Sequence, residues 1–158
     1  MEPKNQLPLS CELLDYVVDH VAVTRVKPTA GQGTLKITPD IGWQKDKRNF
    51  TALLVVGYVC KNVQFKCAIQ GRFRLAETIE DRHLVNAWVN GETMLYGVVR
   101  GLFTPLVAQA IHQTLFLPSV MMQNEVARRI MELREVRQKS LREKASGDKS
   151  QDGAKKTK

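Results

Sequence analysis

The chain has 158 residues, 43% of them hydrophobic, and a formal net charge of +8. This length and composition are typical of a single folded domain and exclude a wholly disordered chain. Residues 124–158 hold 11 Lys+Arg against 6 Asp+Glu, whereas residues 1–123 hold 13 against 10, so the basicity mainly describes a C-terminal extension and gives weak support to nucleic-acid binding.

The first part of the chain has the residue pattern of two β-strands. Residues 16–26 are rich in β-branched side chains, which favour strands, and they end before Lys27-Pro28. Residues 34–38 form a short second strand, because Pro39 lacks the N–H that the next ladder bond requires. The polar residues 40–49 then predict a loop that crosses to the next strand.

Two further strands are predicted to pair as a hairpin. Residues 50–60 are apolar on both faces, which indicates a central strand covered on each side. Lys61-Asn62 connects them to residues 63–75, where apolar and polar side chains alternate as in a strand with one buried and one solvated face. The solvated side of this strand presents Lys66, Arg72 and Arg74.

Helices follow the strands. Apolar spacing predicts a short turn or helix near residues 84–88 that breaks at Asn90-Gly91, then a main helix over residues 94–111 with a broad apolar face. Pro105 lies inside this main helix and should kink or restart it. A second long helix is expected over about residues 121–144. Strands followed by helices favour an α+β fold, a four-stranded antiparallel sheet with two helices packed on one face.

The folded domain is expected to cover residues 1–145, and residues 146–158 are expected to be a disordered basic tail. The longest apolar run, residues 53–60, is too short to span a membrane. We therefore expect a cytoplasmic protein without membrane insertion.

No group of residues in the sequence supports catalysis. His20, His83 and His112 have no partner at the spacing of helical metal sites, and no serine sits in a nucleophile elbow. We therefore expect a protein that is not an enzyme and that uses neither a metal nor a cofactor. Arg100 is the single charge in the main helix, so we expect it to be buried and to bond partners at an element or subunit boundary, with ligand contact as the alternative.

The chain has more apolar surface than one sheet and two helices can easily hide. The main helix, residues 50–60 and the Met121-Met122 pair supply this surplus. Exposed apolar surface of this kind marks oligomer or client interfaces, and methionine suits adaptable contacts, although plain core packing would also explain the methionine pair.

Short motifs follow one another between residues 65 and 118, and with the preceding strand order the pattern covers about residues 16–133. They are Phe65-x-Cys67, Gly71-x-Phe73, Ile79-Glu80, Leu95-Tyr96-x-x-x-Arg100 and Leu115-x-Leu117 before Pro118. Their order and spacing resemble the SecB protein-export chaperones and their SecB-like relatives.

The resemblance implies a homo-oligomer, a dimer of dimers with the long helices in the middle. It also implies a holdase without ATP or metal, which binds unfolded polypeptide in apolar surface grooves. The expected client groove contains Phe65, Ile69, Phe73, Val120, Met121, Met122, Val126 and Ile130. The expected oligomer interface contains Leu95, Tyr96, Val99, Arg100, Leu102, Phe103 and Leu106.

The sequence departs from the family in its charge. SecB proteins receive the basic tail of the translocase motor SecA on an acidic sheet face, whereas the cations of residues 63–75 would repel it, so docking to SecA is not expected. A dedicated client, such as an antitoxin or a secreted protein, fits this departure better. The alternative is a nucleic-acid-associated protein that uses the basic C-terminal helix and tail, with binding that falls steeply with salt.

Overall fold

The computed structural model describes residues 11–28, 33–46, 48–75 and 83–148. Its elements are β1 (Cys11–Arg25), β2 (Thr34–Trp43), β3 (Asn49–Cys60), β4 (Val63–Leu75), α1 (Leu84–Ile111) and α2 (Met122–Asp148). The chain divides after Val126 into two compact units, the second of which contains most of α2. The α+β class predicted from the sequence, four antiparallel strands followed by two helices, is confirmed.

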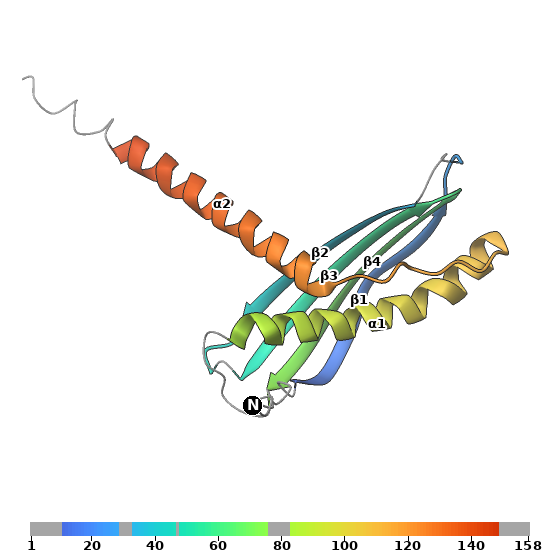
Figure 1. Ribbon diagram of the computed structural model, residues 1–158, viewed down its shortest axis with the longest axis horizontal. Coiled ribbons are helices and arrows are strands. Elements are labelled where there is room, and N and C mark those ends of the chain that lie inside the picture. The colour runs from blue at the N-terminus through green and yellow to red at the C-terminus, as the bar shows by residue number, and fades with distance from the viewer. Residues whose placement is uncertain (1–10, 29–32, 47, 76–82, 149–158) are drawn as a thin grey trace, which may run out of the picture. The chain divides into compact units, whose positions relative to one another are not determined.

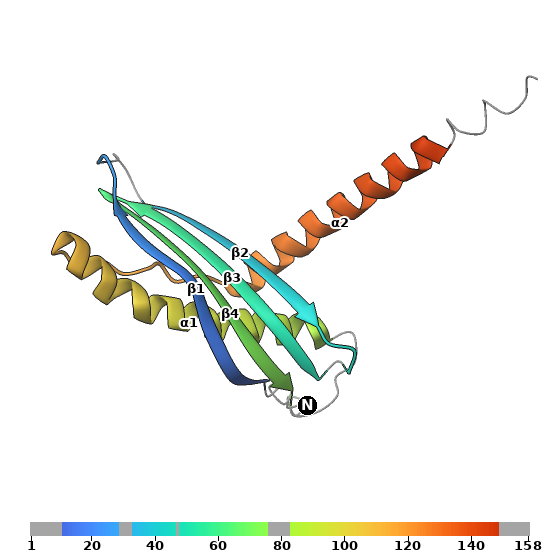
Figure 2. The same cartoon turned by 180° about the vertical axis from the view of Figure 1, so that it is seen from behind.

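The first unit is a sheet with α1 on one face. The strand order is β1-β4-β3-β2, and every neighbouring pair is antiparallel (Figure 1). The predicted hairpin of β3 and β4 is confirmed, with Lys61 at φ 52° in its turn. Figure 2 looks onto the opposite face of the sheet, here called the open face, which no described element of this unit covers. The expectation that β3 is covered on each side is therefore wrong, and Val55 on its open face is 41% exposed.

The second strand continues well past Pro39. Pro39 lies opposite Leu54 in the ladder, and it is tolerated because β2 is an edge strand, where a missing N–H need not break a bond. The predicted crossing loop is instead a tight hairpin connection. Its turn is stabilised by the Asp46 carboxylate, which accepts the backbone N–H groups of Arg48 and Asn49 at 3.0 and 3.1 Å.

The first helix is continuous through Gly91 and Pro105, so the predicted break at Asn90-Gly91 is wrong. A Cβ at Gly91 would lie 2.9 Å from the ring of Phe50, so glycine allows the helix to approach the sheet closely. His112, at φ 57°, ends the helix by donating its N–H to the carbonyl of Ala108.

An aromatic cluster joins α1 to the sheet. The ring of Phe103 meets that of Phe65 edge-on at 5.0 Å between centroids, and Phe50 stacks on Phe73 at 4.9 Å. At the far end of α1, the Arg25 guanidinium of β1 donates two hydrogen bonds to the Ala110 carbonyl, at 3.0 and 2.6 Å. These bonds satisfy a carbonyl of the last turn that has no partner within the helix. The positive guanidinium also interacts favourably with the negative, C-terminal end of the helix dipole.

By length and composition alone, α1 is apolar enough to span a membrane, with a window of mean hydropathy 1.4. Its residues Leu95, Val99 and Phe103 are completely buried in the first unit, and 28% of that window is buried in all. The opposite side of the helix, which includes Met94 at 40% exposure, accounts for the rest of its apolar character.

Glu92 is a charged-type residue in the core, with none of its surface exposed. Burial raises the pKa of its carboxyl to about 8, although Trp88 Nε1–H donates a hydrogen bond to Oε1 at 3.0 Å, which favours the ionised form. Its Oε2 has no hydrogen-bond partner. The carboxyl is therefore mainly protonated at neutral pH.

This carboxyl should make the stability of the fold depend on pH. Between about pH 4.5 and about pH 8 the folded chain holds a proton that the unfolded chain releases, so the free energy of unfolding should fall as pH rises, by up to about 1.4 kcal/mol per pH unit. Glu92→Gln, which carries no titrating proton, should lack this slope, so its stability relative to the native chain should rise from about pH 4.5 to about pH 8 and stay constant above that. Urea unfolding at several pH values measures this, and equal pH slopes in the two proteins would contradict it.

Candidate functional site

The segment that joins α1 to α2, residues 112–121, is here called the link. The link runs back along α1 (Figure 1), and two side chains of the helix hold it. The Tyr96 hydroxyl donates to the Pro118 carbonyl at 2.7 Å, and the Thr104 hydroxyl donates to the Leu115 carbonyl at 3.2 Å. An extended segment is thus fixed on the helix without belonging to the sheet.

Side chains of the link alternate between the core and solvent. Leu117 is 3% exposed, whereas Phe116 before it is 70% exposed. At the end of the link, Met121 is 71% exposed and Val120 is half-buried. Exposed large apolar side chains on a fixed backbone are suited to bind another apolar chain.

The residues predicted to line a client groove do not all reach this surface. Those of the sheet, Phe65, Ile69 and Phe73, are completely buried on the α1 side. Met122 and Val126 are also buried, and Ile130, in the second unit, is half-buried. Val120 and Met121 are the predicted groove residues that the link presents at its surface.

Phe116 was missed by the sequence reasoning, which singled out Leu115 and Leu117 on either side of it. The signal was present, because residues that alternate in an extended segment point to opposite sides. With Leu117 in the core, Phe116 must point outward.

The predicted oligomer-interface residues fall on two sides of α1. Leu95, Tyr96, Val99 and Phe103 are buried in the first unit. Leu102 and Leu106 are half-buried, and Arg100 is exposed. In the isolated chain Arg100 lies outside the buried stripe of residues 95, 99 and 103, so its expected burial at a subunit boundary stays a prediction.

Two other apolar surfaces of the first unit are exposed. One is the edge strand β1, where Tyr16 is 48% and Val17 60% exposed. The other is the outward side of α1, where a Cβ at Gly97 or Gly101 would meet nothing within 4 Å. Both are surfaces on which a second chain could approach the backbone closely.

The open face of the sheet is less basic than β4 alone suggested. Arg72 forms a bidentate ion pair with Asp15 of β1, in which Nε and Oδ1 are 2.8 Å apart. The hydrogen bonds from Arg72 lower the pKa of Asp15. Arg74 lies opposite Glu12 in the ladder, whereas Lys66 lies opposite Ala22. Of the three cations on which the prediction rested, only Lys66 faces an uncharged neighbour on β1.

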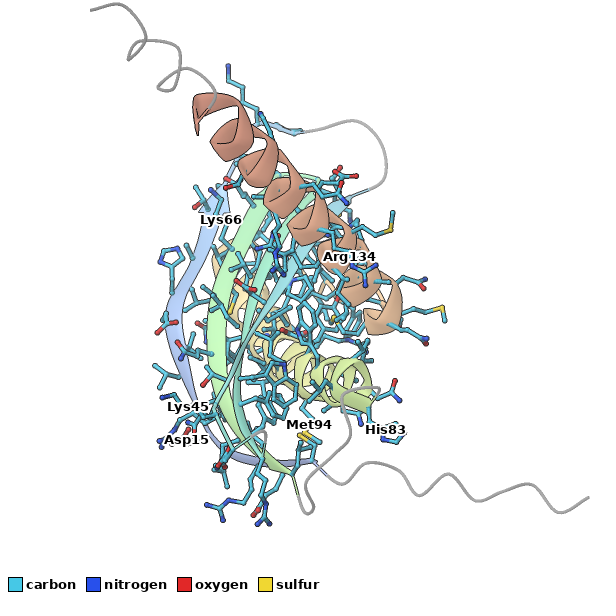
Figure 3. All side chains as sticks on the ribbon, turned by 90° about the vertical axis from the view of Figure 1, so that its left-hand side faces the viewer. Asp15, Lys45, Lys66, His83, Met94 and Arg134 are labelled. Carbon is cyan, nitrogen blue, oxygen red and sulfur yellow. The ribbon has the colours of Figure 1, made fainter. Side chains whose placement is uncertain are left out.

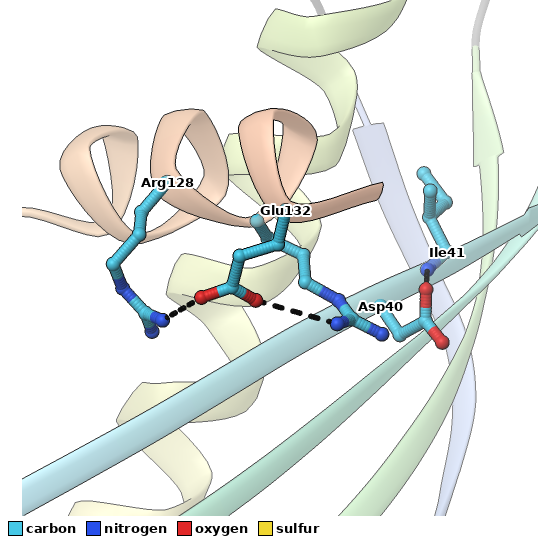
Figure 4. A network of polar contacts seen from close by, with 5 residues as sticks. Asp40, Ile41, Arg128 and Glu132 are labelled. Atoms are coloured by element: carbon cyan, nitrogen blue, oxygen red, sulfur yellow. Dashed lines mark hydrogen bonds and ion pairs between the residues drawn. The ribbon is translucent and has the colours of Figure 1, made fainter. Parts of the chain in front are cut away.

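The second unit offers less free positive charge than its composition suggests. In α2 the Glu132 carboxylate bonds Arg128 at 2.5 Å and Arg129 at 3.4 Å (Figure 4). Elsewhere in the same figure, the Asp40 carboxylate of β2 accepts the N–H of Ile41 at 3.0 Å. The predicted tail beyond residue 148 lies outside the described residues. In the part of α2 whose side chains are described, residues 122–140, these ion pairs leave the nucleic-acid alternative without a specific supporting contact.

Chemistry that would need a metal finds no support in the residues that the structure describes. Among them, no three His, Cys, Asp or Glu side chains gather in a way that could hold a metal ion. The thiols of Cys11, Cys60 and Cys67 are free, and burial raises the pKa of Cys11 to about 11.

No family model and no curated protein matches the chain. Among solved structures, it is similar to a SecB-like chaperone from Mycobacterium tuberculosis in complex with a ChAD peptide from an antitoxin, with a TM-score of 0.56 and 12% identity over 70% of this chain and 87% of that one. A protein of unknown function from Streptococcus agalactiae gives a TM-score of 0.49 and 9% identity over 70% of this chain and 98% of that one. The first similarity supports a SecB-like fold.

Removing the Tyr96 hydroxyl should loosen the link. Tyr96→Phe loses the bond to the part-buried Pro118 carbonyl, so the free energy of unfolding should fall by about 1 kcal/mol and amide hydrogen exchange should accelerate in residues 113–121. Tyr16→Phe is the matched control, because Tyr16 is an exposed tyrosine on the edge strand. Unchanged exchange in the link of Tyr96→Phe would show that the bond does not hold it.

Proposed function

We propose that the chain is a SecB-like chaperone, a holdase that binds non-native polypeptide. The observation that carries this proposal is the fixed extended link, which holds Phe116 and Met121 in water at 70% and 71% exposure on a SecB-like fold. The solved relative of that fold is described as a chaperone with a peptide bound, which supports a polypeptide as the ligand. A dedicated client, such as an antitoxin or a secreted protein, is part of the proposal.

The chemistry of the link suits weak and unspecific capture of apolar segments. A phenylalanine buries about 150–250 Å² in a contact, and burial stabilises by about 25 cal/mol per Å² of apolar area. Methionine adapts its shape to different partners because its side chain is unbranched and flexible. Several such contacts along one unfolded client, or on several copies of the chain, would add through effective concentration.

The proposal includes assembly into a homo-oligomer, arranged as a dimer of dimers. An exposed edge strand with apolar side chains, such as β1, invites pairing with another strand. The outward side of α1 has small residues at positions 97 and 101, which allow close approach of a second helix. In an oligomer with two-fold symmetry, each of these surfaces would pack against the same surface of another copy.

Polar substitutions in the link test the client surface. Phe116→Ser combined with Met121→Ser should raise the concentration needed to suppress aggregation of an unfolded client by at least about tenfold, because the apolar contact is lost. Both positions are exposed, so stability should change little.

Met131→Ser is the matched control, since Met131 is a 62% exposed methionine on α2. Light scattering should show the same mass for all variants. Native-like suppression of client aggregation by the double variant would overturn the proposed surface. An equal loss of suppression in Met131→Ser would show that any exposed apolar residue contributes and that the link has no special role.

Bulky side chains on the outward side of α1 test the assembly. Gly97→Leu combined with Gly101→Leu should lower the mass measured by light scattering to a fraction of the native mass, while a Cβ at either position meets nothing within 4 Å in the isolated fold. Gly42→Leu is the matched control, because a Cβ there also meets nothing within 4 Å and the residue lies on β2. A native chain that is monomeric, or an unchanged mass in the double variant, would contradict this assembly.

A further inference from the structure

The open face of the sheet contains a hollow of about 380 Å³ that the proposed client surface does not use. Side chains and backbone of all four strands line it: His20, Lys36, Thr38, Val55, Gly57, Lys66, Cys67 and Ala68. We call it the basic hollow. It lies on the side of the sheet away from α1, where Figure 3 shows Lys66 and Asp15.

The ladder registers explain why the surface is hollowed there. Lys36 of β2 lies opposite Gly57 of β3, and Gly57 lies opposite Lys66 of β4. Two lysines thus flank a residue without a side chain, in a single row across the sheet. Strands are about 4.8 Å apart, so the two lysine Cα atoms lie about 10 Å from each other, with Gly57 as the floor between them.

The next row along the sheet completes the hollow. It contains Thr38, Val55, Ala68 and His20, which are consecutive partners from β2 to β1. Val55 and Ala68 extend an apolar floor, whereas Thr38 and His20 stand at its sides. The hollow therefore combines an apolar floor with cationic and hydrogen-bonding side chains at the rim.

The charge of the hollow is unbalanced within the first unit. Among the described residues, none that lines the hollow is acidic, although the open face carries acids elsewhere. Asp15 is engaged by Arg72 several residues along the strands, and Lys66 has uncharged Ala22 opposite it on β1. Lys36 and Lys66 are both exposed. Two exposed lysines on either side of one floor, with no acid among the described residues that line it, favour an occupant that carries negative charge.

We propose that the basic hollow is a docking site for an acidic extended segment of a partner protein. Carboxylates two residues apart on one side of an extended chain are about 7 Å apart, a spacing that two flexible lysines can both reach. The apolar floor accommodates the small side chains and backbone between them. This site takes carboxylates, whereas the link takes apolar side chains, so the two surfaces have different ligands.

Nucleic acid fits the open face less well than an acidic peptide. Single strands are usually bound by aromatic side chains that stack on bases, and the residues that line the hollow include no Phe, Tyr or Trp. Two lysines provide few phosphate contacts. Further along the same face Asp15 pairs with Arg72 and Glu12 lies opposite Arg74, so that part of the face adds no net positive charge for a longer phosphate backbone.

Fluorescence anisotropy with short labelled peptides tests the site on the full-length protein at about 0.15 M ionic strength, where surface charges more than about 8 Å apart are largely screened. The probe is a peptide of alternating Glu and Val, compared with alternating Gln and Val and with single-stranded DNA. We expect the Glu peptide to bind and the Gln peptide to bind at least about tenfold more weakly. DNA that displaces the Glu peptide more effectively than unlabelled Glu peptide does would overturn the assignment to an acidic protein segment.

Charge reversal locates the binding. Lys36→Glu combined with Lys66→Glu should weaken the binding of the Glu peptide by at least about tenfold. The matched control is Arg134→Glu combined with Arg137→Glu, which changes the net charge equally at exposed positions of α2. The control should change binding by less than about twofold. Equal losses in the two double variants would mean general attraction to a basic protein and would overturn the proposal.

Filling the hollow is a second test that leaves the charge unchanged. A Cβ at Gly57 meets nothing within 4 Å, so Gly57→Leu should fold normally and place its side chain between the two lysines. Peptide binding should fall by at least about fivefold, while suppression of client aggregation should be unchanged. Undiminished peptide binding by Gly57→Leu would overturn the proposed location. Failure of aggregation suppression in the native chain would refute the chaperone proposal alone.

Discussion

The close packing of α1 on one face of the sheet is the constraint on which the other features of the first unit depend. Glycine makes the approach possible on both partners: a Cβ at Gly91 would lie 2.9 Å from Phe50, and a Cβ at Gly71 of β4 would lie 2.8 Å from Leu95. The aromatic rings of the sheet fill the space between. Larger residues at either glycine would push the layers apart and open voids that cost stability.

This packing determines what remains exposed. Because α1 uses its buried stripe on one sheet face, the second face stays open, and its register brings Lys36 and Lys66 to either side of Gly57. The link follows α1 and is held by it, so Phe116 is displayed on the helix side. An apolar surface and a cationic surface thus belong to opposite layers, which allows them to bind different ligands.

Local patterns were reliable where one rule decided the outcome. The alternation of residues 63–75 and the short Lys61-Asn62 connection correctly predicted a hairpin with one buried face. Local patterns gave wrong boundaries where the place of a residue in the tertiary structure decided the outcome. Pro39 does not end β2, because an edge strand has no need of that N–H, and Gly91 does not break α1, because the helix uses it for close contact with Phe50.

By itself, the sequence determined the fold class, the order of elements and the half-buried character of β4, since these follow from periodicity along a few neighbouring residues. Only the tertiary structure decided which charges face one another and which apolar side chains stay in water. Asp15 neutralises Arg72 from a strand 57 residues away, while Phe116 is exposed because its neighbour Leu117 enters the core. Such pairings depend on strand order and packing, which no local pattern contains.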